Sequence, residues 1–325
     1  MYYLSVDGGG SKTAVLLTDR EGRTVAGGSF GGCSYPEIGF QGVEYVLNGA
    51  LDALTGKAGV AREEIAGAAF GIPCFGEDEE GDQAVDRLIR GILPWAEICI
   101  CNDVKLGWAG SLGLSPGIHV VAGTGAIAYG CNKEGEEARA GGWHEDFSDE
   151  GSGYWLGLRC LALAAKQADG RRKGGRVLEL VMEELGISEP SALPSRYVKC
   201  YRGDRKKVAS LQKVLLKAAR EEDVQAKQAY EEAAKELAEG AAAVAGQLRF
   251  EGSEPVPVSY SGGIFKAGDI VLEPFEKFLS DRGLQLREPL AGPEQGGILL
   301  AVNQKEPGKI EAVRQRLFSL EGKQK

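Results

Sequence analysis

Two glycine-rich turns of similar design lie far apart in the chain, and apolar runs flank both of them. The first is Asp7-Gly8-Gly9-Gly10-Ser11-Lys12-Thr13, and the second is Gly123-Thr124-Gly125. Each pattern predicts a β-hairpin whose tip contains more glycine than an ordinary turn needs. Glycine allows backbone N–H groups to converge on an anion, and the Ser or Thr adds a hydroxyl donor. Together the two turns predict a site for the phosphates of one nucleotide, and hence an ATP-dependent phosphotransferase.

Asp7 stands at the mouth of the first turn, where a carboxylate would repel a phosphate group. A divalent cation between the two charges would remove this repulsion, so the sequence predicts Asp7 as a partner of Mg²⁺. The alternative is a turn-forming role, because Asp-Gly is common at hairpin tips. The three consecutive glycines, together with Ser11 and Thr13, favour the functional interpretation.

Asp103 follows the predicted strand Ala96–Cys101. Open α/β sheets bind their ligands at the carboxyl ends of their strands. A carboxylate at this position can act as a general base that orients and deprotonates a substrate hydroxyl. The alternative is that Asp103 caps the N-terminus of a helix over Val104–Leu112.

Two further segments are candidates for ligand contacts. The run from Gly141 to Trp155 mixes carboxylates and aromatic rings, a combination that suits the hydroxyl pairs and the apolar ring face of a sugar. Helix capping alone would explain Asp149 and Glu150, but it would not explain the preceding Gly-Gly-Trp. Ser261-Gly262-Gly263 follows a predicted buried strand, so a nucleotide's sugar or base can approach this backbone closely. The alternative is a tight connection from strand to helix.

Strands and helices are predicted to alternate along the chain. After the first hairpin we expect strands over 23–29, 66–71 and 96–101, with helices over 41–54 and 82–93. After the second hairpin we expect a helix over 152–167, two helices within 208–247 that separate near 221–224, a strand over 256–260, and helices over 270–279 and 294–303. This order predicts an α/β fold with sheets of mixed direction. The two hairpins also predict an internal structural duplication.

Composition narrows the class of protein. A chain of 325 residues is long enough for two domains, and its net charge of −9 disfavours nucleic acids and membrane surfaces as partners. No secretory signal or apolar run of membrane-spanning length is visible, so we expect a cytoplasmic protein. The seven scattered Cys are expected mostly in the core. No Walker A sequence or zinc-binding spacing is present.

Taken in order, these segments resemble the phosphate 1, connect 1, phosphate 2 and adenosine motifs of the sugar kinase/Hsp70/actin superfamily, and the run from Gly292 to Gly297 resembles its connect 2 motif. The specific resemblance is to the N-acetylglucosamine kinase branch that is grouped with BadF/BadG/BcrA/BcrD-type ATPases. It implies two ribonuclease-H-like domains of the actin-like ATPase type with a nucleotide cleft between them, over residues 1–112 and 113–292. The second domain would carry a helical insertion. A C-terminal helix over about 293–325 would return to the first domain. The resemblance also implies ATP and Mg²⁺ as cofactors and a homodimer.

The resemblance assigns roles to individual residues. Asp103 matches the catalytic base, and Asp7 matches the metal partner. The nucleotide-binding set is Asp7, Gly9, Gly10, Ser11, Lys12, Thr13, Gly123, Thr124, Gly125, Gly262 and Gly263. The sugar-binding set is Ser34, Asp103, Gly142, Trp143, His144 and Asp149. Ser34 stands where the family usually has an Asn, and His144 where it usually has a Gly, so the identity of the sugar stays open.

The function that the resemblance implies is phosphorylation of an amino sugar at its C6 hydroxyl, with N-acetylglucosamine, N-acetylmuramic acid or glucosamine as the substrate. An alternative within the same grouping is an ATPase that activates a 2-hydroxyacyl-CoA dehydratase or a benzoyl-CoA reductase, and such activators bridge an iron–sulfur cluster through Cys. A sugar sensor without catalysis is a third interpretation, which the presence of Asp103 disfavours.

Overall fold

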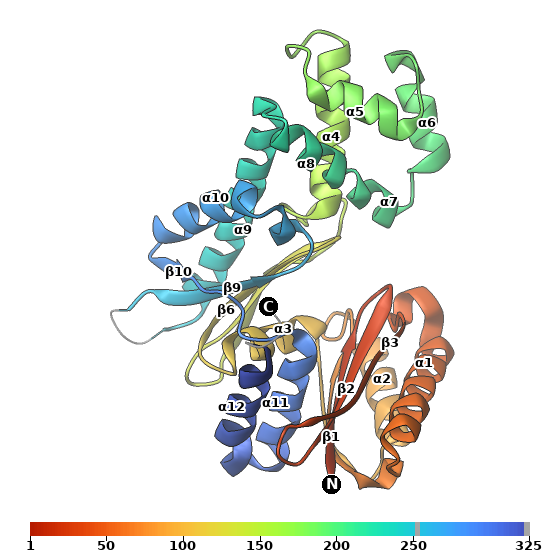
Figure 1. Cartoon of the computed structure of the whole chain (residues 1–325), viewed down its shortest axis with the longest axis vertical. Helices are drawn as coiled ribbons and strands as arrows, with labels where there is room; N and C mark the ends of the chain where they lie inside the picture. The colour runs from red at the N-terminus through yellow and green to blue at the C-terminus, as the bar shows by residue number, and fades with distance from the viewer. Residues whose placement is uncertain (251–253, 322–325) are drawn as a thin grey trace. The chain divides into compact units, whose positions relative to one another are not determined.

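The computed structural model describes residues 1–250 and 254–321, which form two compact units. Unit 1 consists of Met1–Ser115 together with the chain from Glu288 onward, and unit 2 consists of Pro116–Arg287. In Figure 1, unit 1 holds the red, orange and dark blue elements, and unit 2 holds the green and light blue ones. Each unit contains its own five-stranded sheet.

Unit 1 is an α/β unit with helices on both faces of its sheet. Its strands are β1 (Tyr2–Gly8), β2 (Lys12–Asp19), β3 (Thr24–Gly31), β4 (Ile65–Gly71) and β5 (Glu97–Cys101). Its helices are α1 (Tyr35–Ala58), α2 (Glu79–Ile92), α3 (Asp103–Leu112), α11 (Pro293–Lys305) and α12 (Ile310–Glu321), with short 3-10 turns at Arg62–Glu64 and Pro307–Lys309. The strand order is β3-β2-β1-β4-β5. The short apolar run of β4 is typical of a parallel strand that is covered on both faces.

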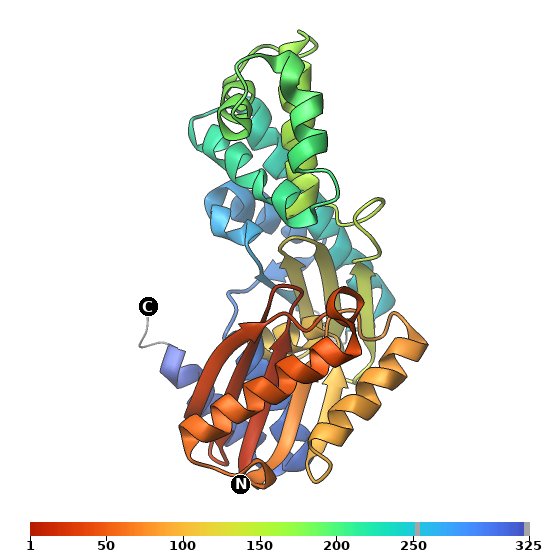
Figure 2. The same ribbon diagram turned by 90° about the vertical axis from the view of Figure 1, so that its right-hand side faces the viewer.

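The apolar stripes of α1 and α2 pack on one face of this sheet, and α3 and α11 pack on the other (Figures 1 and 2). The helix α1 contains the predicted helix over 41–54 and is longer than predicted. It begins at Tyr35 because Pro36 occupies its first turn, where the missing N–H costs nothing. Gly39 interrupts it with φ +70°.

Unit 2 adds a group of helices to its sheet. Its strands are β6 (Gly117–Ala122), β7 (Ala126–Cys131), β8 (Glu137–Gly141), β9 (Val256–Ser261) and β10 (Leu284–Leu286). Its helices are α4 (Gly153–Ala168), α5 (Arg176–Leu185), α6 (Leu193–Cys200), α7 (Arg205–Ser210), α8 (Gln212–Arg220), α9 (Val224–Gln247) and α10 (Asp269–Ser280), with 3-10 turns at Pro190–Ala192 and Ile264–Ala267. The predicted break between two helices is confirmed, because α8 ends at Arg220 and α9 begins at Val224.

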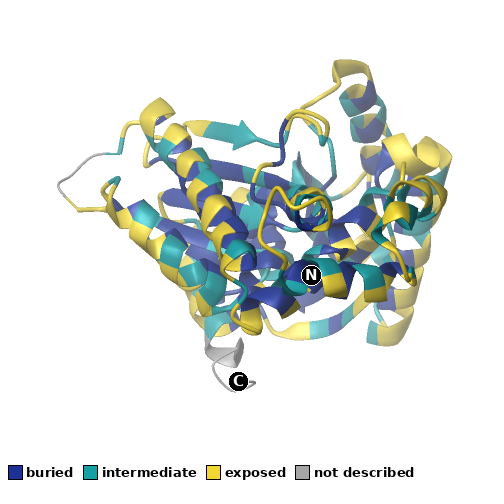
Figure 3. Cartoon of the chain, turned by 90° about the horizontal axis from the view of Figure 1, so that it is seen from above, coloured by how far each residue is buried: buried dark blue, intermediate teal, exposed yellow. Residues whose placement is uncertain are grey.

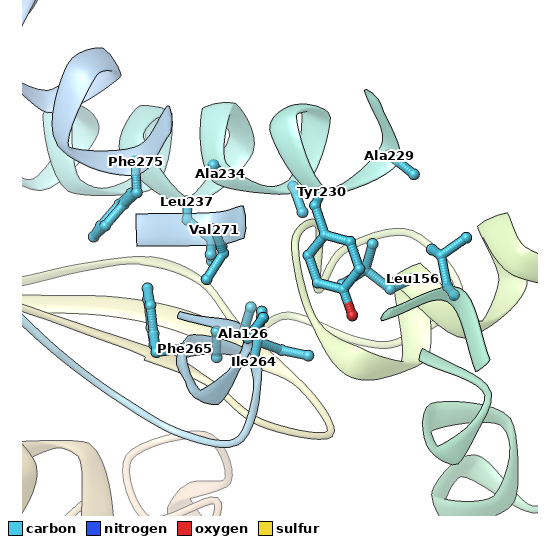
Figure 4. Close-up of a cluster of buried hydrophobic side chains, with 14 of the residues drawn as sticks. Ala126, Leu156, Ala229, Tyr230, Ala234, Leu237, Ile264, Phe265, Val271 and Phe275 are labelled. Atoms are coloured by element: carbon cyan, nitrogen blue, oxygen red, sulfur yellow. The ribbon is translucent and has the colours of Figure 1, made fainter. Parts of the chain in front are cut away.

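The core of unit 2 lies between its sheet and the helices α4, α9 and α10. Figure 4 shows Phe275 of α10 beside Phe265 of the preceding 3-10 turn, and Tyr230 of α9 beside Leu156 of α4 at the other end of the cluster. The alanine-rich side of α9 lets the helix lie close to its neighbours, because alanine adds little volume. Figure 3 shows that buried residues gather in the sheets and on the helix faces turned toward them.

The two sheets share one topology, which confirms the predicted structural duplication. In each sheet the first three strands form an antiparallel meander, and the last two add in parallel beside the first strand of that meander. In unit 2 these strands are β6-β7-β8 followed by β9 and β10. The two glycine-rich turns therefore occupy equivalent positions, each joining the first two strands of its sheet.

Several elements were not predicted, namely β8, β10 and the helices α5 to α7. The strand β8 alternates polar and apolar residues, but it has only five residues and none of them is fully buried, so its signal in the sequence is weak. Within the described residues, no helix is both long enough and apolar enough to span a lipid bilayer.

Candidate functional site

The first glycine turn joins β1 to β2 at the carboxyl end of β1. The strand β1 ends at Gly8 and β2 begins at Lys12, which leaves Gly9, Gly10 and Ser11 in the turn itself. Ser11 and Lys12 are exposed. Thr13 is fully buried, and its hydroxyl donates to the carbonyl oxygen of Gly31 at 2.7 Å, so its side chain supports the turn from below.

Neighbouring backbone approaches this turn closely, and only glycine leaves enough room. A side-chain carbon added at Gly8 would lie 2.3 Å from the Sγ of Cys33 and 2.6 Å from the carbonyl oxygen of Gly71. The N–H of Cys33 also donates to the carbonyl oxygen of Gly9 at 3.1 Å. The turn is thus held between the end of β4 and the segment that leads into α1.

Asp7 and Asp103 are brought together at this edge of the sheet, since β1, β4 and β5 are adjacent parallel strands. Asp7 pairs with Gly71, Gly71 pairs with Cys101, and Asp103 begins α3 directly after β5. Burial raises the pKa of Asp103 to about 6, with a contribution from Glu77. Burial, Asp103 and Glu294 raise the pKa of Asp7 to about 8, and only Lys12 opposes them.

Asp103 is not the N-cap of α3. That position belongs to Asn102, whose side chain accepts from the N–H of Val104 at 3.2 Å. Asp103 is the first residue of the helix itself, and its Oδ1 lies 3.1 Å from the same N–H. The capping alternative for Asp103 is therefore wrong.

Ser34 is almost fully buried, directly after the segment that packs on the first turn. It precedes α1 but makes no side-chain capping hydrogen bond. Three residues later, a carboxylate oxygen of Glu37 lies 2.8 Å from where a side-chain carbon at Gly10 would be. Glu294 adds negative charge near Asp7, Glu77 adds it near Asp103, and Glu37 lies beside the first glycine turn. Sequence reasoning assigned no role to these three, although Glu294 lies in the segment that resembles the connect 2 motif.

The second glycine turn lies between β6 and β7 in unit 2 and is fixed by the start of α4. The N–H groups of Gly153 and Tyr154 donate to the carbonyl oxygens of Gly123 and Thr124 at 2.8 and 3.1 Å. The carbonyl groups of the turn thus point at the N-terminus of α4. The side chain of Thr124 does not take part in these hydrogen bonds and is exposed to solvent.

Gly262 and Gly263 lie beside this second turn. Ser261 of β9 pairs with Val121 of β6, so both strands end at the same edge. A side-chain carbon at Gly262, which has φ +107°, would lie 2.3 Å from the carbonyl oxygen of Ala122. The fully buried His119 supports this arrangement from within the sheet, since its ring nitrogens lie 2.9 Å from the Oγ atoms of Ser259 and Ser261.

The Gly-Gly-Trp segment forms an exposed loop after β8. Gly141 and Gly142 adopt φ +77° and +67°, which favour glycine. Trp143 is 69% exposed, with the guanidinium of Arg139 over its ring at 5.1 Å. His144 is also exposed and stacks on Phe147.

Asp149 and Glu150 do not cap α4, because Ser152 does so by accepting from the N–H of Trp155 at 3.1 Å. Capping as the sole explanation of the two carboxylates is therefore wrong. Asp149 is only 3% exposed, and its Oδ1 accepts from the N–H of Ala126 at 3.1 Å, directly after the second turn. Its Oδ2 forms an ion pair with Arg205. Sequence reasoning missed Arg205, which lies 56 residues further along the chain.

No group of three or more Cys, His, Asp or Glu side chains in residues 1–250 and 254–321 is arranged to hold a metal ion by itself. Four of the seven Cys, namely Cys33, Cys101, Cys131 and Cys160, are buried. This agrees with the expectation that most of them belong to the core.

Comparisons with known proteins agree on one family and one fold. The profile of the BadF/BadG/BcrA/BcrD ATPase family matches residues 4–301. An N-acetylmuramic acid/N-acetylglucosamine kinase of Clostridium acetobutylicum is 30% identical over 280 residues, which is 86% of this chain and 90% of that protein. An N-acetyl-D-glucosamine kinase of Dictyostelium discoideum is 24% identical over 94% of this chain and 98% of its own length.

Among solved structures, a protein assigned as an N-acetylglucosamine kinase from Chromobacterium violaceum matches with a TM-score of 0.76 at 25% identity. The match covers 92% of this chain and 98% of that one. The predicted α/β class and actin-like ATPase fold are confirmed, as is the resemblance to N-acetylglucosamine kinases.

Proposed function

Because the chain belongs to the BadF/BadG/BcrA/BcrD ATPase family, we propose that it is an ATP-dependent kinase that phosphorylates a hydroxyl of an amino sugar. The relatives support the class of reaction, since those named above are sugar kinases. The observation that carries the proposal is the carboxylate of Asp103 at the end of β5, close enough to Asp7 and the first glycine turn to raise the pKa of Asp7.

In this proposal the two glycine turns bind the phosphates of ATP. The backbone N–H groups of Gly9, Gly10 and Ser11 are donors in the first turn, and Lys12 adds a positive charge. In the second turn the donors are the N–H of Gly125 and the exposed Thr124 hydroxyl, whereas the N–H of Gly123 already donates to the carbonyl oxygen of Gly125 at 2.9 Å and holds the turn closed. Gly262 and Gly263 present a backbone without side chains at the edge shared with the second turn, which suits close approach of the nucleoside.

The residues around Asp7 fit a magnesium ion. Burial, followed by repulsion from Asp103 and Glu294, raises its pKa to about 8, so a cation beside it would be stabilised. Mg²⁺ is commonly bound by one or two carboxylates, with phosphate oxygens and water completing its shell, and Asp7 can supply such a ligand. When bound, Mg²⁺ offsets the negative charge of the phosphate oxygens.

Asp103 acts as the general base. It accepts the proton of the sugar hydroxyl, whose oxygen forms the new bond to the terminal phosphorus while the bond from that phosphorus to the ADP oxygen breaks. A pKa raised to about 6 makes Asp103 a better proton acceptor than an ordinary Asp, and it remains ionised at neutral pH. Positioning and charge stabilisation supply most of the rate enhancement in such reactions.

For the sugar we propose contacts with Ser34 in unit 1 and with Gly142, Trp143, His144 and Asp149 in unit 2. Ser34 supports this through its position beside the first turn. The exposed indole of Trp143 supports it as a surface on which an apolar sugar face can stack. N-acetylglucosamine, N-acetylmuramic acid and glucosamine are the substrates we propose, with the C6 hydroxyl as the acceptor.

The test is ADP release with Mg²⁺–ATP against N-acetylglucosamine, N-acetylmuramic acid, glucosamine, N-acetylmannosamine, glucose and no sugar. We expect release that depends on one or more of the amino sugars. Release that ignores every sugar, from protein that purifies with iron, would instead favour a redox-coupled ATPase.

Asp103→Asn tests the base with the best sugar from this panel. We expect turnover to fall roughly 100-fold or more, as general bases contribute, while ATP binding persists. Asp86→Asn is the matched control, because Asp86 is an exposed carboxylate on α2 that pairs with Arg90. Turnover of Asp103→Asn close to that of the control would remove Asp103 from this role.

A further inference from the structure

Arg205 stands at the point where three segments of unit 2 meet. It is the first residue of α7, and Asp204 caps that helix by accepting from the N–H of Lys207 at 2.9 Å. The helix is held against α4, because a side-chain carbon at Gly157 would lie 2.0 Å from the carbonyl oxygen of Val208. This close packing fixes the starting point of the Arg205 side chain.

The guanidinium of Arg205 reaches the second glycine turn. Its Nη2 pairs with Oδ2 of Asp149 and lies 2.6 Å from where a side-chain carbon at Gly125 would be. Its Nε lies 3.8 Å from a carboxylate oxygen of Glu145 in the Gly-Gly-Trp loop. Arg205 therefore lies against the turn at 123–125, near the loop at 141–147, and in contact with Asp149.

Asp149 depends on this partner. Its carboxylate is 4% exposed, so without a cation nearby it would be a buried, uncompensated charge. Its backbone has φ +63°, a conformation that costs free energy in a residue other than glycine. The other carboxylate oxygen accepts from the N–H of Ala126 at 3.1 Å, so the orientation of Asp149 sets the orientation of the turn.

The Nε of Arg205 is buried and has no hydrogen-bond partner among the described residues. An unsatisfied buried donor costs free energy, and a carboxylate oxygen of Glu145 lies 3.8 Å from this Nε. A small shift of the loop at 141–147 toward Arg205 would bring Glu145 within hydrogen-bond distance of this Nε–H. The same guanidinium can therefore couple the loop to the turn.

We propose that Arg205 is a positioning residue of the nucleotide site. It acts through Asp149 to hold the second glycine turn in the geometry that binds the phosphates of ATP. This inference rests on the proposed use of that turn as a phosphate site. It goes beyond the motif residues, because no sequence pattern joins Arg205 to either glycine turn.

The experiment compares Arg205→Gln, Arg205→Lys, Asp149→Asn and the double variant Arg205→Gln/Asp149→Asn in the full chain. Arg202→Gln is the matched control, since Arg202 is an exposed Arg in the same segment. Three readouts are measured: the affinity for ATP without turnover, the KM and kcat of sugar-dependent ADP release, and hydrogen exchange of the Ala126 amide. Melting temperatures identify any variant that does not fold.

We expect Arg205→Gln to weaken ATP binding about tenfold, the scale of losing one hydrogen bond to a charged group, and to speed exchange of the Ala126 amide. Asp149→Asn should weaken ATP binding and speed exchange of the Ala126 amide to the same extent, and in these two readouts the double variant should be no worse than either single variant by more than about twofold, since both residues act in one unit. Arg205→Lys should restore part of the affinity, because it keeps the charge but not the planar fork.

Arg205→Gln with ATP affinity and Ala126 exchange equal to those of Arg202→Gln would overturn the proposal, even if the protein proves to be an active sugar kinase. Additive effects of Arg205→Gln and Asp149→Asn would overturn it as well. If no sugar stimulates ADP release but the variants still weaken nucleotide binding as expected, the proposed kinase activity fails and the role of Arg205 stands. If Arg205→Gln does not fold, the test uses Arg205→Lys and Asp149→Asn, and ATP affinity and Ala126 exchange equal to those of Arg202→Gln in both variants would overturn the proposal.

Discussion

His119 is expected to make the stability of unit 2 depend on pH. It lies on β6 in the middle of the sheet and is fully buried, with Ser259 Oγ at Nδ1 and Ser261 Oγ at Nε2. In neutral imidazole one ring nitrogen donates and the other accepts, and a serine hydroxyl can do either. Burial lowers the pKa of His119 from its ordinary value of 6.5 to about 3.

The sign follows from the order in which the two states take up a proton. Below pH 6.5 the unfolded chain protonates this residue, whereas the folded chain does not until about pH 3. Stability from the neutral ring is therefore present above pH 6.5 and is lost as the pH falls. Each pH unit in this window costs about 1.4 kcal/mol, so between pH 7 and pH 5 the wild type should lose about 2 kcal/mol through this one group.

The assay is native-state hydrogen exchange of peptides from β6 and β9 at pH 7 and pH 5, corrected for intrinsic exchange, because it reports the opening of unit 2 alone. His119→Gln is the comparison, since its amide also donates and accepts but does not titrate. We expect the opening free energy of the wild type to fall by about 2 kcal/mol more than that of the variant. Equal losses in the two proteins would refute the reasoning, because the remaining titrating groups are common to both.

Two other substitutions test the packing and the nucleotide site. Gly296→Ala should destabilise unit 1 by about 1–3 kcal/mol in denaturant unfolding, because the new carbon would lie 2.0 Å from the carbonyl oxygen of Leu106 where α11 crosses α3. Gly308→Ala, which meets no atom within 4 Å, is its control, and equal stability of the two variants would contradict the close crossing. Thr124→Val should raise the KM for ATP about tenfold through loss of one hydrogen bond to a charged group, whereas Thr124→Ser should not. An unchanged KM in the valine variant would remove the second turn from phosphate binding.

Much of the fold could be predicted because its signals are local. The apolar runs beside the two glycine turns predicted both hairpins, and the amphipathic run over 41–54 predicted most of α1. The break at 221–224 was visible because α8 and α9 each have their own apolar stripe. In contrast, β8 has five residues and β10 has three, so the alternation in each is too short to predict a strand, and pairing with a neighbouring strand stabilises both.

Much of the candidate site was also visible in the sequence. Glycine runs, a carboxylate at the end of a strand and a Gly-Gly-Trp loop are contiguous patterns, and their chemistry can be recognised before folding. The two capping alternatives could not be decided in this way. Asn102 and Asp103 are adjacent before α3, and Asp149, Glu150 and Ser152 lie close together before α4. Only the backbone geometry shows which residue caps each helix.

Local sequence patterns thus predicted most of the strands, the glycine turns and the residue types available at them, because these depend on neighbours within a few positions. Contacts between charged residues that are distant in the sequence depend on the tertiary fold. Parallel pairing of β1, β4 and β5 brings Asp7 to Asp103, and the return of the chain in α11 adds Glu294 to them. The packing of α7 on α4 likewise delivers Arg205 to Asp149. A pKa or an ion pair depends on distance in space and on burial, and neither quantity is encoded in sequence spacing.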